Sequence, residues 1–186
     1  MDLTDPNPPV TRNPQQNETL RELLYIAAKI AAAGVFITLL FTFIYGAARV
    51  SGFSMAPAVK DGDLVIFYRP AKNGYLPGDA VITAQGGERT VRRVIATAGD
   101  TVDITEKGLF VNGALVQEPA IYQRTERFAE GVGFPLTVPR GHVFVLADSR
   151  AGREEQRTPD DSRIYGTVGT GDTMGKVITV IRRRGI

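Results

Sequence analysis

A run of 19 residues without a single charge, from Ile30 to Ala48, constrains this 186-residue chain more than any other feature. Lys29 precedes the run and Arg49 follows it. As a helix rising about 1.5 Å per residue, the run is roughly 28 Å long, close to the roughly 30 Å of a bilayer's hydrocarbon core. We therefore expect one membrane-spanning helix and, with the length that remains, one domain of ordinary size.

The residues before the run predict where this helix begins. Residues 1–18 are polar, contain four prolines and show no apolar periodicity, so they are expected to form a disordered tail. Thr19-Leu20-Arg21-Glu22 matches the capping box, in which a threonine hydroxyl and a glutamate bind the first free amides of a helix. The sequence therefore predicts a helix over residues 19–49, with residues 30–48 as the membrane anchor.

A cleavable signal peptide is the alternative interpretation of the same run, because Gly46-Ala47-Ala48 offers small residues where a cleavage site could lie. The apolar region of a secretory signal is about 7 to 15 residues long and follows a short basic segment. This run is longer and follows 29 residues, so an anchor is the better interpretation. Basic residues lie on both sides of it, and charge counting alone does not orient the anchor.

The composition excludes several classes of site. The chain has no cysteine and a single histidine, His142, so disulfides, thiolate metal sites and histidine-rich metal sites are excluded, and no cofactor is expected. The net charge is +2 and the basic residues are scattered, apart from Arg182-Arg183-Arg184, which we interpret as a solvated end of the chain. A nucleic-acid partner is not expected. No pattern indicates an oligomeric state.

Residues 50–186 change to short β-rich runs separated by glycine and proline, which predicts a mainly β domain, a sandwich or folded barrel. Asn112-Gly113 is a strong signal for a type I′ hairpin turn, and longer loops are expected at 118–133 and 149–162. The predicted strands are 63–69, 80–83, 90–96, 109–111, 114–116, 142–146 and 175–181.

Four segments of this region, together with the anchor, resemble the type I signal peptidases. The resemblance covers roughly residues 30–181, and the order of the segments makes it specific. The segments are S-G-F-S-M-A-P-A-V-K-D-G-D-L-V-I from Ser51; G-D-A-V-I from Gly78 with T-V-R-R-V-I-A-T-A-G-D-T-V from Thr90; G-L-F-V-N-G-A-L-V-Q-E-P from Gly108; and P-R-G-H-V-F-V-L-A-D from Pro139 with D-S-R-I-Y-G from Asp161.

The resemblance implies an antiparallel β-fold endopeptidase, held by one membrane helix, that removes signal peptides from exported preproteins. It places the tail in the cytoplasm and the β domain outside the plasma membrane, or the inner membrane of a bacterium. Its expected partners are signal peptides and the lipid bilayer. In that family a serine, here Ser54, attacks the scissile carbonyl, its backbone amide stabilises the oxyanion, and an uncharged lysine accepts the proton. Gly52 stands where some members have an additional hydroxyl.

The general base is where this sequence departs from the family pattern. The resemblance places Arg92 at the lysine position and Arg93 on the family's usual arginine. The pKa of a guanidinium is at least about 12.5, so its neutral fraction at pH 7 is below about one in 10⁵, and a shift of about 5 units would cost about 7 kcal/mol. Arg92 is therefore expected to be a poor base.

Of the other family positions, some are substituted in this sequence and others are present. Pro159 replaces a serine that orients the lysine, and Ala147 replaces a glycine, whereas Asp161 and Arg163 are present and are expected to form a structural ion pair. Met55 and Pro57 are expected to shape the turn at Ser54.

Neither Lys60, in a polar turn, nor His142, at a strand start, is a persuasive substitute base. Two functions therefore remain. The chain is a signal-peptidase-type serine endopeptidase with an unusual role for Arg92, or it is a catalytically inactive homologue that binds peptides or assists assembly at the membrane.

Overall fold

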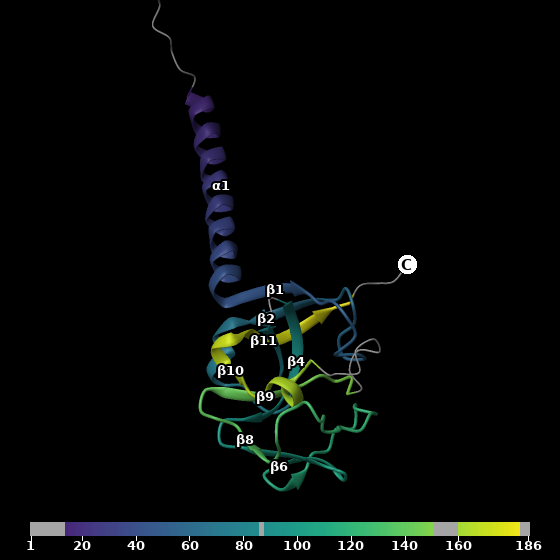
Figure 1. Ribbon diagram of the computed structural model, residues 1–186. Coiled ribbons are helices and arrows are strands. Elements are labelled where there is room, and N and C mark those ends of the chain that lie inside the picture. Colours follow the sequence, from purple (N-terminus) through teal and green to yellow (C-terminus); the bar gives the residue numbers. More distant parts are fainter. Residues whose placement is uncertain (1–13, 86–87, 151–159, 183–186) are drawn as a thin grey trace, which may run out of the picture. The chain divides into compact units, whose positions relative to one another are not determined.

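The computed structural model describes residues 14–85, 88–150 and 160–182 (Figure 1). These residues divide into two compact units, one ending at Leu40 and the other beginning at Phe41. The first unit consists of the N-terminal helix, and the second contains the strands.

The N-terminal helix α1 spans Pro14–Leu39 and continues as a π-helix, η1, over Leu40–Ile44. It therefore begins five residues before the predicted start, at a proline, which the first turn of a helix tolerates because the missing N–H has no partner there. The prediction that the tail extends to residue 18 is wrong for 14–18, and residues 1–13 of that tail lie outside the described residues. Over Glu18–Ile44 the helix is long and apolar enough to cross a membrane.

The predicted helix end at Arg49 is also wrong, because the last five residues form strand β1, Tyr45–Arg49. This strand pairs antiparallel with β2, Leu64–Tyr68, in a register that matches Tyr45 with Tyr68 and Arg49 with Leu64. Hydrophobicity could not separate the two states, since the uncharged residues 45–48 fit a short strand as well as the end of a membrane helix. The span predicted over residues 30–48 is therefore helical only as far as Ile44.

Packing in this strand explains the small residues that resembled a cleavage site. Gly46 lies opposite Phe67, and a β-carbon on Gly46 would come within 2.2 Å of the Phe67 ring. Phe67 is buried, so its ring cannot move aside without opening the core. The glycine is therefore required by close contact within the sheet.

Two antiparallel sheets make up the second unit (Figure 1). The larger sheet has the order β1-β2-β11-β3-β4-β9-β10, and the smaller has the order β7-β6-β5-β8. The remaining strands are β3 Ala80–Gln85, β4 Glu88–Thr97, β5 Thr101–Thr105, β6 Gly108–Val111, β7 Ala114–Leu115, β8 Leu136–Thr137, β9 His142–Leu146, β10 Val168–Gly169 and β11 Thr173–Ile181. The short helices are η2 Arg69–Asn73, α2 Ser162–Tyr165 and η3 Thr170–Asp172.

The seven predicted strands are confirmed, β9 with the predicted ends and the other six with shifted ends, and so is the turn between β6 and β7. Asn112 and Gly113 both have positive φ, 52° and 79°, as a type I′ turn requires. The prediction missed β1, β5, β8 and β10. Of these, β5 carries a visible period of two, with Val102 and Ile104 buried, whereas β8 and β10 are two residues long and depend on their partners.

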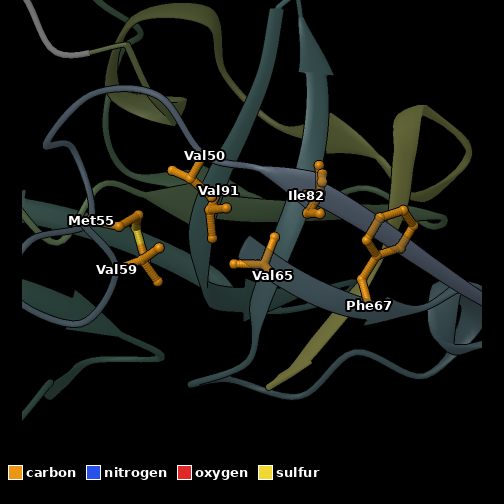
Figure 2. Packing of buried hydrophobic residues seen from close by; sticks show 8 residues of the cluster. Val50, Met55, Val59, Val65, Phe67, Ile82 and Val91 are labelled. Carbon is orange, nitrogen blue, oxygen red and sulfur yellow. The ribbon is translucent and has the colours of Figure 1, made fainter. Parts of the chain in front are cut away.

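Alternation along the strands divides the core into clusters on opposite faces of the larger sheet. Ile82 belongs to a cluster with Met55, Val65 and Phe67, whereas its neighbour Val81 packs in another cluster (Figure 2). A third cluster joins the two sheets, because Phe144 of β9 packs with Ile104 of β5. β4, which lies between β3 and β9 in the larger sheet, contributes residues to all three clusters.

Candidate active site

Ser54 lies in the loop between β1 and β2, which is closed at its base by two backbone hydrogen bonds. The Val50 amide donates to the Asp63 carbonyl, and the Gly62 amide donates to the Val50 carbonyl, both at 2.9 Å. A third bond ties the loop to the end of β9, since the Ser149 amide donates to the Ser54 carbonyl at 2.9 Å. The backbone of Ser54 is therefore held from two directions.

Met55 anchors the same loop in the core. Its side chain is 1% exposed and packs with Val59 and Val91, which Figure 2 shows in the same cluster. Since Val91 immediately precedes Arg92 in β4, this packing brings the serine loop against the strand that carries the arginine. Met55 is therefore buried in the core next to Ser54, and its predicted role in shaping the turn stays a prediction.

Gly52 and Pro57 lie on either side of the serine. Gly52 has a φ of 87°, which favours glycine, and its amide donates to an Asp61 carboxylate oxygen at 2.7 Å. Pro57 is exposed at the surface of the loop. The Gly52 amide is thus occupied by Asp61, while the role of Pro57 in shaping the turn stays a prediction.

Arg92 contacts the serine directly. Its Nη1 donates to Ser54 Oγ at 3.0 Å, and among the described residues it is the one side chain hydrogen-bonded to that oxygen. The guanidinium is itself buried, with 1% of the side chain exposed, although arginine is rarely buried unless it is paired. The structure therefore places the two predicted site residues together.

Asp160 is the partner that holds this buried charge. Arg92 Nη2 donates to Asp160 Oδ2 at 2.7 Å, and Arg92 Nε donates to the Asp160 carbonyl at 2.6 Å. A further bond runs from Arg92 Nη1 to the Val91 carbonyl at 2.7 Å. Four of the five N–H donors of the guanidinium thus have acceptors within the protein.

Tyr165 of α2 completes the surroundings of the guanidinium. Burial raises the pKa of its hydroxyl above the ordinary value, and the positive charge of Arg92 opposes this rise. The tyrosine therefore stays protonated at neutral pH and supplies a neutral hydroxyl beside Arg92. It cannot act as a strong base there.

Arg93 points to a different partner. It binds Asp148 through two bonds, from Nε to Oδ1 at 2.7 Å and from Nη2 to Oδ2 at 2.6 Å, and its Nη1 donates to the Gly78 carbonyl at 2.8 Å. The hydrogen bonds to Asp148 raise the pKa of Arg93 above its ordinary value. This bidentate pair joins β4 to the end of β9 beside the site.

Asp161 and Arg163 form the predicted ion pair. Arg163 Nη2 lies 2.9 Å from Asp161 Oδ2, and both side chains are 0% exposed. Asp161 also caps α2 by accepting from the Arg163 amide at 3.1 Å, and it accepts from the Ala147 amide at 3.1 Å. Because Asp161 directly follows Asp160, these contacts also fix the backbone next to Asp160.

Three further residues at the site escaped the sequence prediction: Asp148, Asp160 and Tyr165. All three lie inside or beside the quoted fourth segment, but nothing in their spacing says which side chain they contact. Pro159, expected where the family has a serine, lies outside the described residues. Ala147 is buried and is held to Asp161 through its amide.

The residues considered as substitute bases do not contact Ser54. Lys60 is exposed, and its amide donates to Asp63. His142 bonds through Nδ1 with the Arg140 carbonyl at 3.1 Å. Among the described residues, no three His, Asp or Glu side chains are grouped to hold a metal ion.

Comparison with known proteins decides the family. The family model described as "Signal peptidase, peptidase S26" matches residues 23–181. The chain belongs to this signal peptidase family. The match confirms the resemblance that the four sequence segments indicated, while the roles of Ser54 and Arg92 stay predictions.

Individual signal peptidases are similar along most of their length. Signal peptidase I of Bacillus licheniformis is 32% identical over 154 residues, which cover 74% of this chain and 82% of that protein. Signal peptidase IB of Staphylococcus aureus strain N315 is 29% identical over 176 residues, covering 84% and 88%. The crystal structure of a signal peptidase I from Enterococcus faecalis V583 matches with 27% identity and a TM-score of 0.44, covering 56% of this chain and 97% of that one.

Proposed function

We propose that this chain binds the signal peptides of exported preproteins at a membrane and does not cleave them through a serine–lysine mechanism. One observation carries the proposal: a charged guanidinium donates its hydrogen bond to Ser54 Oγ. Membership of the signal peptidase family supports the class of ligand. The apolar helix over Glu18–Ile44 supports a membrane location. In this proposal the β domain lies on the outer side of a plasma or bacterial inner membrane, as the resemblance to the family implies.

The direction of the hydrogen bond explains why Ser54 is not activated. A nucleophilic serine needs a neighbour that accepts its proton, whereas a protonated guanidinium has only donors. The Asp160 carboxylate stabilises the charged form of Arg92. The ion pair therefore presents a donor, and not a proton acceptor, to Ser54.

The same geometry leaves Ser54 able to bind a peptide. Its oxygen accepts from Arg92, so its O–H remains available to donate to a peptide carbonyl. The backbone of the serine is fixed by Ser149 and by the packing of Met55. A rigid donor at this position suits recognition of an extended peptide, with small side chains expected one and three residues before the position at which the family cuts.

A serine endopeptidase is the second candidate, and the distance between Arg92 Nη1 and Ser54 Oγ favours it. A nitrogen atom at 3.0 Å from Ser54 Oγ lies within the roughly 2.6–3.2 Å expected between a nucleophile and its base. In that reading Ser54 attacks the peptide carbonyl and its backbone amide stabilises the oxyanion. The proton of Ser54 then has to reach an acceptor other than the charged form of Arg92.

A cleavage and binding assay separates the two candidates. The full chain in detergent is incubated with a preprotein that carries an A-x-A-like signal, and wild type is compared with Ser54→Ala by mass spectrometry. We expect wild type to retain the preprotein on an affinity resin, Ser54→Ala to retain it more weakly because the hydroxyl donor is missing, and both to cleave it at the background rate. Cleavage by wild type that disappears in Ser54→Ala would instead establish the endopeptidase, and a wild-type protein that neither retains nor cleaves the preprotein would exclude both candidates.

A further inference from the structure

A pocket of about 730 Å³ lies next to the site residues within the second unit. Three site segments contribute to it: Pro57 follows Ser54 by three positions, Arg93 follows Arg92, and Asp148 precedes Ser149. Three residues of chain span at most about 11 Å, so Pro57 lies within about three extended peptide residues of Ser54. A peptide held at Ser54 can therefore reach this pocket.

Most of the pocket wall is apolar. β4 contributes Val94 and Ile95, and the segment after β7 contributes Val116 and Ile121. Such a wall favours an apolar side chain of a ligand, because its burial removes apolar surface from water.

The charges at the pocket are unbalanced. Glu118 is neutralised by Arg150, whose Nη2 lies 2.5 Å from Glu118 Oε1, and Asp148 is neutralised by Arg93 at 2.6 Å. Lys60 and Arg182 also line the pocket, are exposed, and form no ion pair with any residue that the structure describes. Two positive charges without an ion-pair partner among the described residues therefore border an apolar pocket.

We propose that this pocket binds the first residues of the mature part of the preprotein, by an apolar side chain next to an acidic one. This rests on the proposed function, in which the signal peptide lies at Ser54. The acidic residue has to come from the mature part, because a signal peptide has a basic start, an apolar centre and a small-residue end. Charge complementarity with Lys60 and Arg182 selects the acidic residue, and the wall selects its apolar neighbour.

Three fluorescent synthetic peptides test this assignment. Each carries an A-x-A-like end of a signal sequence, and the first peptide stops there. The second peptide continues with six further residues that include Leu and Glu. The third peptide has the same six-residue extension with Lys in place of Glu. Binding to the full chain in detergent is measured by fluorescence anisotropy at low and high salt. The pocket variant is Lys60→Glu with Arg182→Glu, and the matched control is Lys107→Glu with Arg140→Glu, which changes the charge equally outside the pocket.

For wild type and the control, we expect the glutamate peptide to bind about five- to tenfold more tightly than the lysine peptide at low salt, with a smaller difference at high salt. The pocket variant should reverse that order and bind the shortest peptide as wild type does. Equal effects of the two double variants, or no difference between the peptides, would overturn the pocket assignment alone. Failure of the shortest peptide to bind wild type would overturn the proposed function and the pocket assignment with it.

Discussion

Arg92 donates a hydrogen bond of 3.0 Å to the hydroxyl of Ser54, and Asp160 holds the same guanidinium from its other side. The serine is thus next to a cation that is already neutralised by a carboxylate. A base at position 92 would have to be uncharged to accept the proton of Ser54. A carboxylate at position 160 favours a positive charge there instead, so the identity of residue 160 matters as much as that of residue 92.

We expect Arg92→Lys to give Ser54-dependent cleavage that rises with pH, because only the neutral amine accepts a proton. Asp160 stabilises an ammonium beside it and raises the pKa of that lysine. The double variant Arg92→Lys with Asp160→Asn should therefore reach half of its maximal rate at a lower pH than Arg92→Lys. Rates of preprotein cleavage from pH 6 to 10 measure this, and coincident profiles would contradict the role given to Asp160.

Met55→Ala should lower the free energy of unfolding by about 2–5 kcal/mol, because it leaves a cavity at a fully buried position. Phe53→Ala in the same loop is the control, since Phe53 is 68% exposed and its loss should change stability by less than about 0.5 kcal/mol. Denaturant unfolding in detergent measures both. Equal losses would show that Met55 does not anchor the loop.

Arg163→Met should lower the free energy of unfolding by about 3–5 kcal/mol, since it leaves the buried carboxylate of Asp161 without its charged partner. Adding Asp161→Asn to Arg163→Met should recover part of this loss, because the unpaired charge disappears. The double-mutant cycle is read from the same unfolding curves. Strictly additive single effects would mean that the two side chains do not interact.

Gly46→Ala should lower the free energy of unfolding by about 1–3 kcal/mol, because the new methyl group would collide with the buried ring of Phe67. Gly171→Ala is the matched control, with no atom within 4 Å of the added carbon. Thermal unfolding of the two variants should differ clearly. A stable Gly46→Ala protein would place β1 further from β2 than this structure does.

Asp100 makes stability depend on pH on the acid side. The Thr97 amide and the Asn112 side chain donate to its carboxylate, and these bonds hold its pKa below the ordinary value. Since the pKa is lower in the folded state, the stabilisation is complete above the ordinary pKa near 4 and is lost as pH falls through the folded value. The difference in melting temperature between wild type and Asp100→Asn should therefore shrink from pH 6 to pH 3, and a constant difference would contradict this linkage.

Local pattern predicted much of the fold. A type I′ turn depends on two adjacent residues, so Asn112-Gly113 identified it, and strands with β-branched residues such as β4 and β9 were recognisable for the same reason. The end of the helix was not predictable from local pattern, because residues 45–49 form a strand only through their hydrogen bonds with β2. Short strands such as β10 likewise exist through their partner, here β9.

The sequence by itself determined the family, an apolar N-terminal helix, a mainly β domain and the presence of Ser54 and Arg92 in their motifs, since each of these is encoded in contiguous residues. The tertiary structure alone decided that Arg92 reaches Ser54 Oγ and that Asp160, 68 positions further along the chain, holds its charge. Such contacts depend on how β4, the serine loop and the start of α2 pack together, whereas the direction of the hydrogen bond follows from residue type, because a guanidinium only donates.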